Sequence, residues 1–284
     1  MSEVQNLSMP LKDKINAHDA IVPEGVKRIK HTSPYCRTKI WGVDEFGQTL
    51  FEEENQVVLG GSLFTLQKVW GVESSLNIET LNSIMGIATA GQAVSDLKNT
   101  FVCLFGVGYG GAGDTAKSVK DVKYYEREIF DMVPLRVPEG ELTEQEKLQY
   151  FFKTTLQTGR NAYYLKRFEE TPQISVLWKD GVEGEDGTAV EEGVHTTQRT
   201  EPIEAFVEIH LKITKKDVRE FFDMNGDIDE ARFNSIGLFT GVLCDLGNGE
   251  YDFKEVRLFS KLNIPNEYLT LRKDMDIYYR VYSS

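Results

Sequence analysis

A strict alternation of apolar and polar residues in the last third of the chain is the feature that most constrains its fold. Apolar residues take every second position in segment 203–213, and acidic, basic or aromatic residues take most of the positions between them. The same period returns in segments 256–264 and 275–281. Because successive side chains of a β-strand point to opposite faces, this period predicts strands with one apolar face. The polar opposite face predicts an antiparallel sheet rather than a parallel sheet buried on both sides.

The end of the sequence predicts three successive strands joined by polar turns. They lie in segments 231–241, 256–264 and 275–282. Pro265 stands between the last two strands, where a missing backbone N–H does least harm to a sheet. A final strand ties this end of the chain into the sheet.

The preceding residues predict a mixture of strands and helices. The apolar segment 55–70 predicts a hairpin that turns at Gly60 and Gly61. In a further segment, Thr143 and Glu146 have the spacing of a helix capping box. The other predicted strands are 100–105, 162–168 and 173–178, and the predicted helices are 121–131, 143–157 and 215–222.

These elements predict a β-rich α+β fold with an antiparallel β-sandwich or barrel-like C-terminal core. Segment 1–55 lacks a sustained period and is interpreted as an N-terminal arm or irregular segment with a few short strands. Segment 56–158 is interpreted as a mixed α/β portion, and segment 159–284 as the antiparallel β-domain. Within that domain, segment 179–199 is rich in Gly, Glu and Asp, and it is predicted to be an exposed acidic loop.

The charge balance argues against a nucleic-acid partner. The chain has 45 acidic and 32 basic residues, which give a formal charge of −13. Binding to phosphates requires clustered lysine and arginine, so we expect no specific nucleic-acid binding. An acidic surface suits either a channel that must not retain DNA or simple solubility.

The cysteines and the apolar runs predict a protein made in a reducing cytoplasm. Cys36, Cys103 and Cys244 are odd in number and widely spaced, which predicts free thiols. Cys103 and Cys244 stand in apolar runs and are predicted to be core residues. The N-terminal segment has no secretory signal pattern, and the longest apolar run, 100–113, is too short to span a bilayer. We therefore expect no membrane partner.

The sequence GVGYGGAGDT is similar in spacing to a phosphate-binding loop. Gly106, Gly108 and Gly111 match GxGxxG. No parallel βαβ pattern surrounds them, however, and Asp114 stands where a P-loop needs lysine. We therefore interpret this segment as a loop, either a flexible turn or a close backbone approach between subunits, and expect no cofactor.

Neither metal ligands nor catalytic residues emerge from the sequence. Asp223, Asn225, Asp227 and Asp229 begin like an EF-hand loop, but Ile228 replaces the required glycine. A polar turn is preferred there, with a loosely bound Ca²⁺ ion as the alternative. The four histidines are isolated, and no nucleophile motif is present. We expect a protein without metal, cofactor or enzymatic activity.

Aromatic residues supply the candidate interface positions. Three adjacent pairs of tyrosines place one ring on each side of a strand or helix. Such amphipathic rings suit both the rim of a core and a protein interface. The six candidate interface residues are Tyr35, Trp41, Tyr109, Tyr124, Tyr163 and Tyr278.

The C-terminal pattern resembles virion proteins of tailed bacteriophages. It consists of ARFNSIGLFTG, then RLFSKLNIP, then the alternating ending DIYYRVYS, and it covers about the last third of the chain. In that group a neck, tail or baseplate component closes on a β-domain of this pattern. The resemblance implies a structural, non-enzymatic virion protein that is assembled in the host cytoplasm and contacts other virion proteins.

On this basis we expect a homo-oligomeric ring in which exposed strands and the N-terminal arm pair with neighbours. Two other classes stay open. The first is a receptor- or carbohydrate-binding β-module, such as a fibre or capsid decoration protein, which needs an exposed aromatic platform. The second is a nucleotide-dependent enzyme, which rests on the glycine-rich loop alone.

Overall fold

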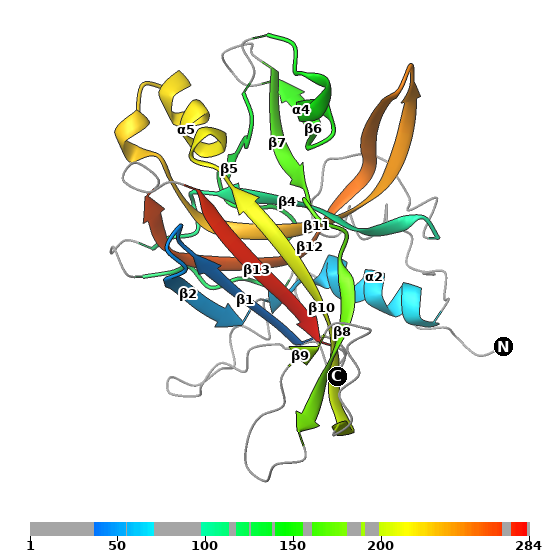
Figure 1. Ribbon diagram of the computed structural model, residues 1–284. Coiled ribbons are helices and arrows are strands. Elements are labelled where there is room, and N and C mark those ends of the chain that lie inside the picture. The colour runs from blue at the N-terminus through cyan, green and yellow to red at the C-terminus, as the bar shows by residue number, and fades with distance from the viewer. Residues whose placement is uncertain are drawn as a thin grey trace, which may run out of the picture.

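The computed structural model describes residues 37–54, 56–70, 98–113, 118–124, 126–137, 140–155, 161–180, 189–190, 199–268 and 274–282. Strands predominate in these ranges and form two sheets (Figure 1). All pairs of neighbouring strands are antiparallel. The predicted β-rich fold with antiparallel sheets is therefore confirmed. Neither sheet closes on itself among the described strands.

Sheet 1 brings together strands from both ends of the described chain. It has six strands in the order β2-β1-β13-β10-β8-β9. Their bounds are Arg37–Val43 (β1), Thr49–Glu54 (β2), Gln173–Asp180 (β8), Ala189–Val190 (β9), Arg199–Ile213 (β10) and Met275–Tyr282 (β13). The central strand β13 sets Ile277 opposite Gly42 on one side and Leu211 on the other. Strands far apart in sequence therefore share one register.

Sheet 2 is built around a long hairpin of β11 and β12. It has seven strands in the order β3-β12-β11-β4-β7-β6, with β5 also paired to β4. Their bounds are Gln56–Val57 (β3), Thr100–Gly108 (β4), Met132–Val133 (β5), Tyr150–Thr155 (β6), Asn161–Arg167 (β7), Arg232–Gly247 (β11) and Glu250–Tyr268 (β12). β4 pairs with β11 only as far as Val242, so the hairpin projects beyond it (Figure 1).

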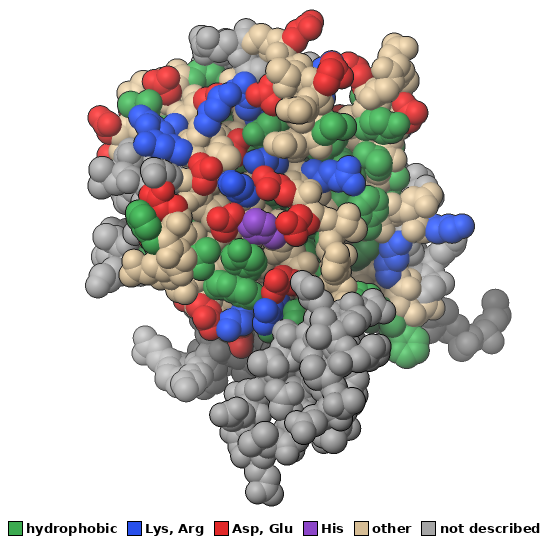
Figure 2. Space-filling view, viewed as in Figure 1, with side chains coloured by type: hydrophobic (Ala, Val, Ile, Leu, Met, Phe, Trp, Pro, Cys, Tyr) green, Lys and Arg blue, Asp and Glu red, His purple; other side chains and the backbone are tan. Residues whose placement is uncertain are grey.

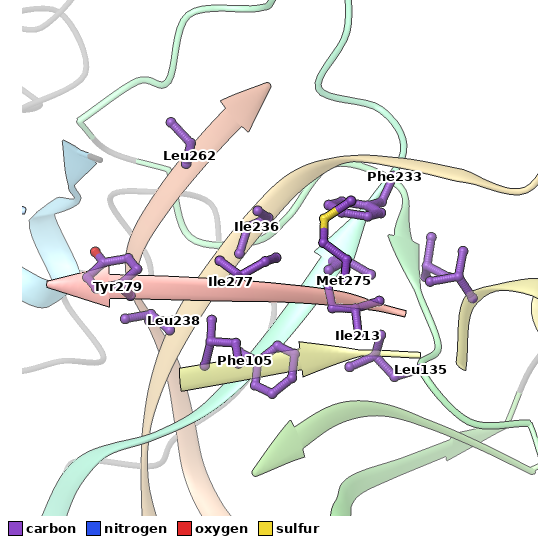
Figure 3. Packing of buried hydrophobic residues seen from close by; sticks show 14 of the residues in the cluster. Phe105, Leu135, Ile213, Phe233, Ile236, Leu238, Leu262, Met275, Ile277 and Tyr279 are labelled. Atoms are coloured by element: carbon purple, nitrogen blue, oxygen red, sulfur yellow. The ribbon is translucent and has the colours of Figure 1, made fainter. Parts of the chain in front are cut away.

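One hydrophobic core lies between the two sheets. Sheet 1 crosses in front of sheet 2 in Figure 1, and Ile277 and Tyr279 of β13 lie against Ile236 and Leu238 of β11 in Figure 3. The buried hydroxyl of Tyr279 lies 2.8 Å from Ser260 Oγ on β12, within hydrogen-bond distance. Burial of the apolar faces drives the sheets together, and this bond satisfies the polar group that burial would otherwise penalise.

A second, smaller apolar cluster covers the other face of sheet 2 and explains the glycines of β4. Ile129 packs into a hollow formed by Gly106 and Gly108 of β4 and Gly237 of β11. A Cβ atom at Gly237 would lie 2.9 Å from Ile129 Cδ1, and one at Gly108 would overlap the Ile129 side chain. Two of the three glycines of the GxGxxG match therefore serve packing.

The predicted strands are confirmed. Segment 203–213 forms most of β10, and segments 100–105, 162–168 and 173–178 lie in β4, β7 and β8, apart from Phe168, the residue after β7. The predicted helix 215–222 is α5 (Lys215–Met224), which is capped by Thr214 and Asp217 and followed by the 3-10 helix η1 (Ile228–Glu230). The three C-terminal strands are β11, β12 and β13.

Two details of β12 differ from the prediction. Pro265 lies inside the strand rather than after it, next to a register shift where Phe233 pairs with Glu267 and Ser235 with Asn263. A second shift omits Phe259 from the pairing with β11. A bulge inserts one unpaired residue and exchanges the faces of the strand, so the alternation does not run unbroken.

The predicted hairpin in segment 55–70 is wrong. After β3, this segment forms helix α2 (Leu59–Trp70), which packs along β12. A Cβ atom at Gly60 would lie 2.9 Å from the Leu258 carbonyl oxygen, and one at Gly61 would overlap the Phe259 carbonyl oxygen. The two glycines allow the helix to approach the strand and do not form a turn.

The predicted helix 143–157 is correct only in its first turn. Thr143 and Glu146 form the expected capping box, but the helix α4 (Glu144–Lys147) is followed by strand β6. Tyr150 then packs in the core between the sheets and Phe151 in the second cluster. Packing on opposite faces requires a strand.

The predicted helix 121–131 is also wrong, because the described part of this segment contains no helix. Its last residues lie beside the end of β4 instead. The Tyr109 N–H donates to the Asp131 carbonyl at 3.1 Å, and the Gly110 N–H donates to the Phe130 carbonyl at 3.2 Å. These hydrogen bonds pair the carbonyl groups of Phe130 and Asp131, which hydrogen bonds within a helix would otherwise have paired.

Strands from all three predicted segments contribute to the two sheets. β1 and β2 belong to the predicted arm 1–55 but occupy sheet 1 beside β13. β3 and β4 belong to the predicted mixed portion and pair with β12 and β11. Of the predicted loop 179–199, residues 189–190 form β9 against β8, whereas 181–188 and 191–198 lie outside the described residues.

Of the two cysteines in the described residues, only one is in the core. Cys103 is buried on β4, and burial raises the pKa of its thiol to about 12. Cys244 is half-buried on the projecting hairpin, so its predicted core position is wrong. Both are free thiols, and Cys36 lies outside the described residues.

Candidate functional site

A row of stacked rings crosses the outer face of sheet 1, the face that points away from the core. We call Trp41 of β1, Tyr278 of β13 and His210 of β10 the ring row; the strand register sets them directly opposite one another. The centroids of Trp41 and Tyr278 are 5.5 Å apart with 17° between planes, and those of Tyr278 and His210 are 4.9 Å apart with 11°. The rings therefore stand face to face, and such cross-strand pairs stabilise a sheet.

Arg280, beside the ring row, contacts both aromatic rings and a carboxylate. The Arg280 guanidinium lies 5.0 Å from the Trp41 centroid and 4.7 Å from the Phe206 centroid, within the range of cation–π attraction. Arg280 Nε donates to Glu208 Oε2 at 2.5 Å. Burial lowers the pKa of Arg280, but the hydrogen bond and charge of Glu208 outweigh it and raise the pKa overall. Arg280 is therefore a fixed positive charge.

Polar atoms of the ring row reach the protein surface. His210 Nε2 lies 2.8 Å from Asp276 Oδ1, and the His210 side chain is 24% exposed. Burial, followed by the negative charges of Asp276 and Glu208, raises the pKa of Tyr278, so its hydroxyl stays protonated at neutral pH. Figure 2 views this face, where acidic and basic side chains surround the histidine and apolar side chains lie below it.

Because the three rings stack on one another, the faces between them are closed to the solvent. A platform for a sugar ring needs an open aromatic face, and the mutual stacking covers the faces between Trp41, Tyr278 and His210. Aromatic edges that carry hydrogen-bonding groups, set beside an arginine, are instead the composition of a protein interface. The arrangement suits contact with another protein.

The structure brings two of the six predicted interface residues together and separates the others. Trp41 and Tyr278 meet in the ring row, whereas Tyr109 packs against Phe222 of α5 with 5.5 Å between centroids. The remaining positions are Tyr163 on β7, half-buried against the core; Tyr124, which is exposed and accepts a backbone bond from Leu59; and Tyr35, outside the described residues.

Sequence reasoning missed three members of this face: His210, Phe206 and Arg280. Their alternation with apolar residues showed that they lie on the polar faces of β10 and β13. The missing information was the register that sets Trp41 opposite Tyr278 and Tyr278 opposite His210. Residues of one strand cannot reveal which partner strand will lie beside them.

The glycine-rich segment is held by its own chain. The Gly111 N–H donates to Asn234 Oδ1 at 2.6 Å, and Asn234 Nδ2 donates to the Tyr109 carbonyl at 2.9 Å. Asn263 Nδ2 donates to the Lys120 carbonyl at 2.9 Å. The segment makes a close backbone approach within its own chain, and Gly106 to Gly108 lie in strand β4 rather than in the predicted loop. A close approach between subunits stays a prediction. A flexible turn does not fit these bonds.

A buried lysine lies beneath residues 126–130. Lys261 of β12 is fully buried, with its ammonium 3.5 Å from Glu126 Oε2 and 3.2 Å from the Phe130 ring centroid. Burial disfavours the charged form and lowers the pKa of Lys261 to about 8, although Glu126 partly opposes this shift.

This depressed pKa predicts a pH dependence that a variant can isolate. Since the unfolded chain holds the Lys261 proton up to its ordinary pKa, the unfolded state binds more protons between pH about 8 and 10.5, and stability rises with pH in that window. Relative to Lys261→Met, the free energy of unfolding of the natural chain should gain on the order of 2 kcal/mol from pH 7 to 9.5. Urea unfolding of both proteins at each pH measures the difference, and parallel curves would contradict it.

A buried ion pair anchors helix α5 to sheet 2. Lys166 of β7 and Asp217 of α5 are almost fully buried, and Nζ lies 3.3 Å from Oδ2. The Tyr150 hydroxyl donates to Asp217 Oδ1 at 2.6 Å, and the Thr214 N–H donates to Oδ2 at 2.9 Å. Burial, then the charge of Asp217, raises the pKa of Tyr150. This carboxylate is saturated by its own chain, so the cluster is structural.

The acidic turn after α5 does not form the EF-hand arrangement. Asp223 lies in the last turn of α5, Asn225 follows as its C-cap, and Gly226 has φ +82°. Asp229 lies in η1, so the side chains do not follow a single ion-binding loop. No group of three or more His, Cys, Asp or Glu side chains that could hold a metal occurs in the described ranges.

Comparison with protein-family models, with curated proteins and with solved structures found no match for this chain. The described part of the chain contains no helix that is long and apolar enough to cross a membrane. Function must therefore be inferred from the geometry of the sheets and of the outer face of sheet 1.

Proposed function

We propose that this protein is a structural subunit of a tailed-phage particle, in the neck, tail or baseplate, and that it assembles through protein contacts without catalysis. The two sheets with one shared core would act as a rigid β-sandwich that carries interfaces on its surface. The observation that carries the proposal is the outer face of sheet 1, where the ring row and Arg280 gather interface-forming residue types at one place.

The phage context rests on the resemblance of the C-terminal pattern, and the assembly role rests on the geometry. A sugar-binding module is less well supported, because stacking within the ring row closes both faces of Tyr278 and one face each of Trp41 and His210. A nucleotide-dependent enzyme is also less well supported. Gly106 and Gly108 lie inside an antiparallel strand, whereas a dinucleotide-binding loop joins a parallel strand to a helix.

Replacement of Trp41 by alanine tests the interface. If the face mediates self-association, the loss of a central aromatic anchor should weaken it by about 2 kcal/mol, or roughly thirtyfold in the dissociation constant. Light scattering across a concentration series measures the mass of the natural chain and of the variant. Leu148→Ser is the matched control, because Leu148 is an exposed aliphatic residue on another part of the surface.

Urea unfolding of both variants separates assembly from folding. We expect Trp41→Ala to remain folded, because its ring lies on the outer face and outside the shared core. A natural chain that stays monomeric at every concentration would contradict self-assembly through this face, and so would equal masses for the natural chain and Trp41→Ala.

A further inference from the structure

The outer edge of β2 forms an acidic rim on sheet 1. β2 is the last strand of the sheet, and no described strand pairs with its other edge. Its sequence ends in Glu52, Glu53 and Glu54, all of which are exposed. The Glu52 side chain pairs with Lys39 at 2.7 Å, whereas no side-chain hydrogen bond or ion pair joins Glu53 or Glu54 to another described residue. The edge can therefore accept positive charge as well as a backbone ladder.

This acidic edge is protected against pairing with a copy of itself. Glu52 and Glu54 lie opposite Trp41 and Lys39 on the outer face, and Glu53 lies opposite Ile40 on the core side. Two such edges side by side would bring like charges together on both faces. Charged side chains commonly protect edge strands in this way. A strand with lysine or arginine at matching positions would be accepted.

The chain itself supplies such a strand in segment 26–31, VKRIKH. We infer that segment 26–31 of a second copy adds to the free edge of β2 as an antiparallel strand. One register places Ile29 opposite Phe51 and, at the same time, Lys27 opposite Glu53 and Arg28 opposite Glu52. An apolar pair and an ion pair then fall on the core side, with a second ion pair on the outer face.

We take the partner to be a second copy, because the segment could reach its own edge in this direction only if it were fully extended along a straight line through the sheet. An antiparallel strand on β2 would run parallel to β1. Its last residue would lie about 20 Å from Arg37 along the strand direction and two strand spacings to the side. The straight line between the two residues, drawn through the sheet, would be about 22 Å long. Residues 32–36 supply six peptide links to Arg37, which reach at most about 22 Å when fully extended. A path around the sheet is longer.

Pairing at the β2 edge would add a second contact to the proposed self-assembly. It rests on the proposed function only for the identity of the partner, which is a second copy of this chain. Full-length protein grown in light and in ¹⁵N-labelled medium is mixed, allowed to exchange and treated with a zero-length carbodiimide cross-linker. Peptide mass spectrometry should find Lys27 joined to Glu53 in mixed light–heavy pairs. Joined peptides with only matched labels would place the segment on its own subunit and overturn the proposal, and so would the absence of the Lys27–Glu53 product.

Charge reversal provides the second readout. Lys27→Glu and Glu53→Lys should each weaken self-association at least about tenfold, because like charges then face each other. The double variant should restore it. Asp229→Lys is the control, since it makes the same charge change on an exposed residue outside the rim. Association that is unchanged by both reversals would refute this contact alone, whereas a natural chain that never associates would refute the proposed self-assembly as well.

Discussion

Replacement of Asp217 by alanine is expected to lower the free energy of unfolding by about 4 kcal/mol, because it leaves a buried ammonium without its counter-charge. Asp217 Oδ2 lies 3.3 Å from Lys166 Nζ, and Oδ1 accepts the Tyr150 hydroxyl at 2.6 Å. The same carboxylate accepts the N–H of Thr214 and so caps helix α5. Urea unfolding followed by far-UV circular dichroism measures the loss.

Two further variants separate the contributions. Thr214→Ala removes only the hydroxyl of the cap and should cost about 1 kcal/mol. Lys166→Met combined with Asp217→Ala should be more stable than Asp217→Ala alone, because it removes the unpaired charge that the single change creates. A double variant that is as unstable as the sum of both single variants would show that the two side chains do not depend on each other.

Replacement of Gly111 by valine is the second change with a large expected effect, about 3 kcal/mol or more of lost stability. A Cβ atom at Gly111 would overlap Ser235 Oγ and lie 2.7 Å from both the Asn234 carbonyl oxygen and Asn263 Oδ1. The segment would have to move away, and the hydrogen bond from the Gly111 N–H to Asn234 would be lost. Chemical unfolding of the variant measures this loss.

Gly140→Ala is the control for this change, because a Cβ atom at Gly140 meets nothing within 4 Å. It should alter stability by less than about 0.5 kcal/mol. A normal stability for Gly111→Val would contradict the close approach seen at this residue. A melting temperature of the natural chain that rises with added ATP or NAD would instead support the phosphate-binding interpretation of the glycines.

The strands that could be predicted from sequence are those with one face in the core. In β10, Ile209, Leu211 and Ile213 are buried between the sheets, while Glu208 and His210 point outwards, so the period of two is visible. Elements in contact on two sides lose this signal. Sheet 2 has an apolar cluster on each face, and for that reason the apolar residues of β6 were predicted to be helical.

The glycines of segment 55–70 led to a different error, in which a turn was predicted where the chain is helical. Gly60 and Gly61 predicted a turn from local conformation, but the decisive fact is the backbone of β12, which lies almost two hundred residues later. Prediction of the site was limited in the same way, by contacts between residues that are distant in sequence. The polar faces that carry Trp41 and Tyr278 could be predicted, whereas the pairing of β1 with β13 that stacks them depends on two distant strands.

The pairing of β1 with β13 has a consequence for synthesis of the protein. β1 and β2 leave the ribosome before the other described strands, but β13, which pairs with β1, is translated more than two hundred residues later. At ordinary translation rates that interval is on the order of 10 to 45 s. A lone two-stranded hairpin is marginally stable. The nascent chain must therefore keep this hairpin unpaired, or hold it on a chaperone, until residues 275–282 emerge.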